Sequence, residues 1–104
     1  MTYEEIIKEL ELQEISVEDF AYGDIKNPIV NIGPWKEVEQ VGGEGQGDTW
    51  YSVHYFEDHK LYIQTNGRYS SYDGVTFYGG YALCTEEVFP VEVKVIQYHT
   101  KPAA

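Results

Sequence analysis

Thr49-Trp50-Tyr51-Ser52-Val53-His54-Tyr55-Phe56 is the clearest strand pattern in the sequence, and the rest of the predicted sheet is built around it. Successive side chains of a strand point to opposite faces of the sheet, so this stretch predicts a strand with two different faces. One face would carry Trp50, Ser52, His54 and Phe56, and the other Tyr51, Val53 and Tyr55. A turn at 57–60 and a return strand at 61–65 complete a predicted hairpin.

Short strands with turn signals between them flank this hairpin. We expect further strands at 35–41, 75–78 and 91–98. Asn66-Gly67 and Asp73-Gly74 are strong turn signals, because these residue types accept positive φ. Consecutive strands joined by tight turns favour an antiparallel meander.

Helical periodicity is confined to the beginning of the chain. Thr2 and Glu5 form a predicted capping box at the start of a helix over 2–14. A second, short helix over 17–22 is expected to end at Gly23. The predicted apolar face of the first helix consists of Tyr3, Ile6, Ile7 and Leu10.

These patterns predict a single α+β domain over residues 1–104. Residues 1–24 would form a helical acidic segment, and 35–98 an antiparallel β meander. Residues 23–34 would connect them as a short strand or an extended link. The helix and the short helical turn are expected to pack on a curved antiparallel sheet, or a small barrel, of four to six strands.

Charge restricts the classes of partner. The 104 residues include 18 acidic and seven basic side chains, which gives a formal net charge of −11. Direct binding of nucleic acid is disfavoured, because phosphate contacts need clustered Lys and Arg. A basic protein partner is favoured, since a negative field steers its approach. Residues 1–24 hold eight acids against Lys8 alone, so this segment is either an ordinary solvated face or a mimic of nucleic-acid phosphates.

The cysteine content and the hydrophobic runs of the chain indicate its cellular compartment. Cys84 is the single cysteine, which fits a reducing environment. The first residues lack the basic and apolar regions of a signal peptide, and the apolar runs are too short to span a bilayer. We expect a cytoplasmic protein that uses no cofactor or metal and does not bind membranes.

Residues 66–81 have the composition of a protein-contact loop. They are rich in Tyr, Ser, Gly, Asn and Asp, and Arg68 is their only cation. Tyr supplies large contact area at low entropic cost, whereas Ser and Gly supply adaptable hydrogen bonding. The same composition also suits a tightly turning hairpin, so it indicates binding without naming a ligand. The predicted contact residues are Arg68, Tyr69, Ser71, Tyr72 and Tyr78, with Trp50, Glu44 and Asp48 beside them.

The candidate catalytic and metal-binding motifs of the sequence are incomplete. The glycine-rich loop at 42–48 lacks the Gly-Lys-Ser/Thr of a phosphate-binding loop, and its acids would repel phosphate. His54, Glu57, Asp58 and His59 are the densest group of possible metal ligands, but no third histidine is nearby in sequence. We therefore predict that the protein is not an enzyme, with a small metal-dependent hydrolase as one alternative.

Several segments resemble small uncharacterised proteins encoded by bacteriophages. These are 41–48 with Trp50-Tyr51, then 67–74, then 87–91, and the resemblance covers about 35–98. It implies a host cytoplasm and a small protein that binds a host or phage factor. The chain also resembles the general class of phage inhibitors that block basic nucleic-acid-binding sites.

The predicted function is a small acidic protein-binding module, a phage-type accessory or inhibitor protein. It would occupy a basic surface of a partner such as a nucleic-acid-binding protein. The second alternative is a virion or assembly component that self-associates through its tyrosine-rich surface.

Overall fold

The computed structural model describes residues 1–42, 49–70, 72 and 74–90. The helices are α1 (Tyr3–Leu12), α2 (Val17–Tyr22) and α3 (Gly80–Cys84), with one 3-10 turn, η1 (Glu57–His59). The strands are β1 (Trp35–Val41), β2 (Thr49–Phe56), β3 (Leu61–Ser70), β4 (Gly74–Thr76) and β5 (Thr85–Val88).

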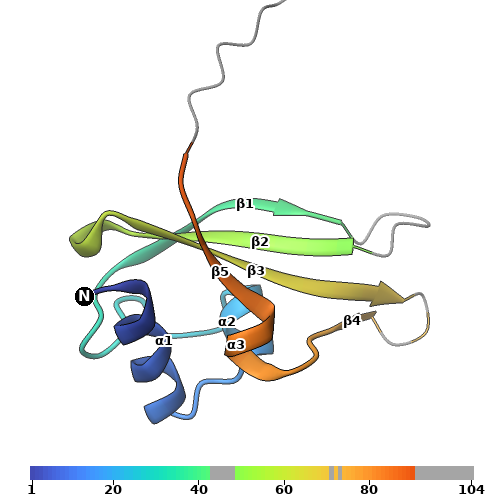
Figure 1. The fold of residues 1–104 in the computed structure, drawn as a ribbon, viewed down its shortest axis with the longest axis horizontal. Helices are drawn as coiled ribbons and strands as arrows, with labels where there is room; N and C mark the ends of the chain where they lie inside the picture. The colour runs from blue at the N-terminus through green and yellow to red at the C-terminus, as the bar shows by residue number, and fades with distance from the viewer. Residues whose placement is uncertain (43–48, 71, 73, 91–104) are drawn as a thin grey trace, which may run out of the picture.

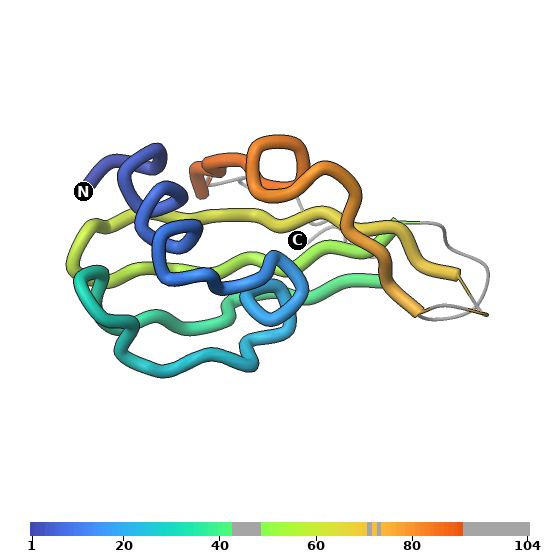
Figure 2. Tube along the Cα trace, turned by 90° about the horizontal axis from the view of Figure 1, so that it is seen from below, coloured from blue at the N-terminus to red at the C-terminus, as the bar shows by residue number. Residues whose placement is uncertain are grey.

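The described elements form two layers. The three helices lie on one side of the sheet (Figure 1), and the view from below shows α1 and α2 in front of the strands (Figure 2). The sheet is antiparallel, with the order β1-β2-β3-β4, and β5 also pairs with β3. The protein is therefore α+β with a curved, open sheet, and the predicted alternative of a closed barrel is wrong.

The beginning of the chain folds as its capping residues predict. The Thr2 hydroxyl accepts a hydrogen bond from the Glu5 amide at 3.2 Å, and the Glu5 carboxylate accepts one from the Thr2 amide at 2.9 Å. The Thr2 amide, followed by the Thr2 hydroxyl, stabilises the charged carboxylate of Glu5 and holds its pKa below the ordinary value. Helix α2 begins after Ser16 and ends at Gly23, whose φ of +75° is easy for glycine only.

The core lies between the helices and the inner face of β2 and β3. As predicted, alternate residues of β2 face the helices: Trp50, Ser52, His54 and Phe56 are all buried. The apolar core comprises Ile6, Ile7, Leu10, Phe20, Ile29, Ile32, Phe56, Leu61, Ile63 and Tyr81. The segment at 23–34 contributes to it through a turn closed by the Ile29–Gly33 bridge, rather than through a strand.

The predicted turn at Asn66-Gly67 is wrong. Both residues lie within β3, which runs on to Ser70, and they pair with Tyr51 and Trp50 of β2. Gly67 is present for a different reason, namely close packing. A Cβ atom there would lie 2.5 Å from Val75 Cγ1 and 2.7 Å from Cε1 of the Phe77 ring.

The sequence did not indicate how the chain continues after β4. The strand expected at 75–78 occurs at Gly74–Thr76. Helix α3 and strand β5 were not predicted, and together they return the chain to the outer edge of β3. The strand predicted at 91–98 and most of the loop at 42–48 lie outside the described residues.

Substitution of Gly67 tests this reassignment. We expect Gly67→Ala to lower the free energy of unfolding by about 1–3 kcal/mol, because the added methyl group overpacks the contact with Val75 and Phe77. Urea unfolding at neutral pH measures the change. Asn66→Ala is the control, and it should cost less than about 1 kcal/mol, because it removes only the hydrogen bond that the Asn66 side chain accepts from Gln64. Equal losses in both variants would instead support a turn that needs two residues with positive φ.

Candidate protein-contact surface

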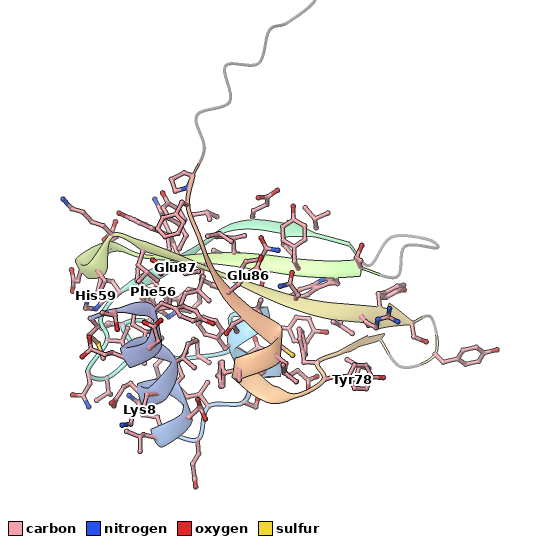
Figure 3. All side chains as sticks on the ribbon, in the orientation of Figure 1. Lys8, Phe56, His59, Tyr78, Glu86 and Glu87 are labelled. Atoms are coloured by element: carbon pink, nitrogen blue, oxygen red, sulfur yellow. The ribbon has the colours of Figure 1, made fainter. Side chains whose placement is uncertain are left out.

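A shallow groove lies between the β3–β4 hairpin and α3. Its volume is about 230 Å³. Tyr78 and Leu83 line it and remain 67% and 79% exposed, although both are large and apolar. Figure 3 shows the Tyr78 side chain below β4, beside α3. The other lining residues are Asn66, Gly67, Arg68, Thr76 and Cys84.

The structure brings together part of the predicted contact set. Arg68 and Tyr78 line the same groove. Tyr72 is 96% exposed in the connection between β3 and β4. Tyr69 pairs with Val75 in the sheet and is half-buried, so it offers less area than Tyr72 or Tyr78. Ser71, Glu44 and Asp48 lie outside the described residues.

Trp50 is a correction to the predicted contact set. It is only 3% exposed. The Tyr22 and Phe77 rings meet its indole edge-on, with centroids 5.3 Å and 5.6 Å away. The alternation along β2 puts Trp50 on the helix-facing side together with His54. The surface of the indole is therefore buried inside the protein and is not available to a partner.

Leu83 is the contact candidate that sequence reasoning missed. Its side chain packs over Gly79, where a Cβ atom would collide with it, and Gly79 has a φ of +88°. Glycine at position 79 therefore lets the Leu83 side chain approach the backbone closely. The Gly79-Gly80 pair was the available signal, because two glycines before a short apolar run permit such a sharp change of direction.

The two histidines considered as metal ligands do not converge. His59 lies in η1, where its Nε2 is 2.7 Å from the Ile32 carbonyl oxygen and its Nδ1 is 3.0 Å from the N-terminal amine. His54 is buried inside the core. Within 1–42, 49–70, 72 and 74–90, no group of three or more His, Cys, Asp or Glu side chains is placed to hold a metal ion.

His54 has an apolar, aromatic environment. Its ring lies 4.9 Å from the Phe20 ring and 5.3 Å from the Trp35 ring, measured between centroids. Neither ring nitrogen has a hydrogen-bond partner in the part of the chain that the structure describes. This burial lowers the pKa of His54 to about 4, because the charged imidazolium loses its hydration. His54 is therefore neutral at physiological pH and serves packing.

Cys84 is also part of the packing. It is buried, and its thiol donates a hydrogen bond to the Tyr78 carbonyl oxygen at 3.0 Å. Burial raises the pKa of the thiol, so the nucleophilic thiolate is disfavoured. The contact connects the floor of the groove to the backbone of Tyr78.

No helix among the described residues is both long enough and apolar enough to cross a membrane. Comparisons of the chain with protein-family models, with curated proteins and with solved structures gave no match.

The buried His54 predicts a specific dependence of stability on pH. The unfolded chain takes up a proton near pH 6.5, whereas the folded protein does so only near pH 4. Stability should therefore fall as the pH drops through this window, by up to about 3 kcal/mol from His54 alone. Urea unfolding of the parent and of His54→Phe at both ends of the window measures it.

The comparison with His54→Phe is needed because carboxylates also titrate at the acidic end. The variant should lose less stability than the parent on acidification, by about the amount assigned to His54. Parallel pH profiles for the two proteins would show that His54 is hydrated in the folded state.

Proposed function

We propose that this protein is a small acidic protein-binding module that occupies a basic surface of a partner protein. The convergence of Arg68, Tyr78 and Leu83 on one groove is the observation that supports it, together with the exposure of Tyr72 in the connection between β3 and β4. A phage-type accessory or inhibitor protein acting in the host cytoplasm is the biological setting we propose. A nucleic-acid-binding protein is the proposed partner class.

The exposed side chains have the chemistry of interface anchors. Tyr is enriched among residues that dominate binding energy, because it combines apolar area with a hydrogen-bonding hydroxyl. Full burial of an exposed apolar side chain of this size stabilises a complex by about 1.5–3 kcal/mol. Tyr72, Tyr78 and Leu83 are all exposed and available for such burial.

The net charge of −11 adds selectivity to these contacts. A negative field accelerates encounter with a basic surface and opposes encounter with an acidic one. The same field opposes close approach of two copies of the chain. It therefore weighs against the alternative in which a virion or assembly component self-associates through its aromatic surface.

Capture from a lysate of the bacterial host is the first test. Tagged protein is incubated at low and at moderate salt, and bound proteins are identified by mass spectrometry. One basic partner that is lost as salt rises supports the proposal. A bait that binds no partner and sediments as a discrete oligomer supports the self-association alternative and contradicts the proposal.

The contact residues are tested on the purified partner. We expect Tyr72→Ala combined with Tyr78→Ala to weaken its affinity by at least about 30-fold, because two aromatic anchors are lost. Isothermal titration calorimetry measures the affinity. Phe89→Ala is the control, since Phe89 is 72% exposed and lines a different surface hollow, together with Val38 and Val88. An unchanged affinity in a folded double variant would show that the partner binds elsewhere.

A further inference from the structure

A second groove lies in the helical layer, apart from the groove lined by Tyr78 and Leu83. It runs between the end of α1, the start of α2 and the segment that follows α2, and its volume is about 360 Å³. Its apolar lining comes from Ile15, Ile25, Ile29 and Val30. We refer to it below as the acidic groove, because Glu14, Asp19 and Asp24 also line it.

The charge of the acidic groove is unbalanced. Its three carboxylates face a single cation, Lys26. Helix α1 ends at the groove with no basic residue in its last turn, so the negative end of its dipole is uncompensated. Lys26 and the positive end of the short helix α2 oppose this negative charge, but the three carboxylates outnumber the single cation, so the groove favours a positively charged group above its apolar residues.

Hydrogen bonds hold the walls of the acidic groove in place. The Gln13 side chain donates to the Val30 carbonyl oxygen at 2.6 Å and to the Glu9 carboxylate at 2.9 Å. Asn31 donates to the same carboxylate at 3.0 Å. On the opposite side, the Tyr81 hydroxyl donates to the Ile15 carbonyl oxygen at 2.7 Å. With its walls fixed in this way, the groove would lose little conformational entropy when a ligand binds.

We propose that the acidic groove binds an arginine-bearing segment of the partner protein. The aliphatic stem of arginine would cover the isoleucines, while its guanidinium would reach the carboxylates. Arginine suits this site better than lysine because its planar group donates several hydrogen bonds and is more weakly hydrated. This inference rests on the proposed function, since it names the chemistry that the basic partner must present.

A defined peptide tests the inference without the partner. The probe is acetyl-Leu-Arg-Gly-Arg-Leu-amide, and its counterpart replaces both arginines with uncharged citrulline. Amide chemical shifts are followed by NMR at about 20 mM and about 200 mM salt. We expect shifts centred on residues 13–15, 24–26 and 29–30, weaker binding at the higher salt, and at least about tenfold weaker binding of the citrulline peptide.

Two charge-matched double variants localise the effect. Glu14→Gln with Asp24→Asn removes two charges from the acidic groove and should weaken binding at least about tenfold. Glu57→Gln with Glu87→Gln removes two exposed charges elsewhere and should change binding less than about twofold. Equal losses in both variants, shifts spread over the acidic surface, or no shifts would overturn the inference.

The peptide experiment and the lysate capture can fail independently, so they test the inference and the proposed function separately. Peptide binding in the acidic groove does not involve Tyr72 or Tyr78, so it supports the inference even where lysate capture yields no basic partner. Capture of a partner that needs the tyrosines, combined with no peptide binding, overturns the inference and leaves the proposed function standing.

Discussion

The ring of Phe20 joins the two layers of the protein. It extends from α2 to the inner face of β2, where its centroid is 6.1 Å from that of Phe56 and 4.9 Å from that of His54. It also lies 6.0 Å from the ring of Tyr81 in α3. Short helices have little stability of their own in water, so α2 and α3 depend on this burial. The orientation of both grooves therefore depends on one aromatic cluster.

The one-sided arrangement of the helices determines which residues remain available for contact. Trp50, Phe56 and Tyr81 are used to bury the inner face of the sheet. Tyr72, Tyr78 and Leu83 follow β3 in the sequence, and all three side chains stay largely exposed. The aromatic and small residues of 66–81 therefore have two roles. Some of them pack β3 against β4, and others stay exposed.

Local patterns predict the elements from α1 to β2. Capping residues and period-two alternation located α1, α2, β1 and β2, since in these segments local preference and tertiary burial agree. Asn66-Gly67 gives a wrong prediction of a turn. A glycine that is needed for positive φ and a glycine that is needed for close packing cannot be told apart in a sequence. The distinction needs Val75 and Phe77, which only the fold places against Gly67.

The candidate contact surface is less predictable than the fold, because the exposure of a side chain is set by tertiary packing. Residue type predicts that Tyr can bind, but only exposure decides which Tyr does, and exposure depends on pairs such as Trp50 with Tyr22. Leu83 and the acidic groove were missed because they arise from packing between segments that are distant in sequence. Gln13 and Val30 illustrate this, since 17 residues separate them.

Under the proposed function, the two grooves would impose complementary requirements on the partner. The groove lined by Tyr78 and Leu83 would favour an apolar side chain of the partner. The acidic groove, with Glu14 and Asp24, would favour a positively charged side chain with an apolar stem. Helices α2 and α3 are in contact, and both lie on the same side of the sheet. A highly charged ligand such as a free polycation would satisfy only the acidic groove. Specificity for a folded basic protein would therefore come from meeting both requirements together.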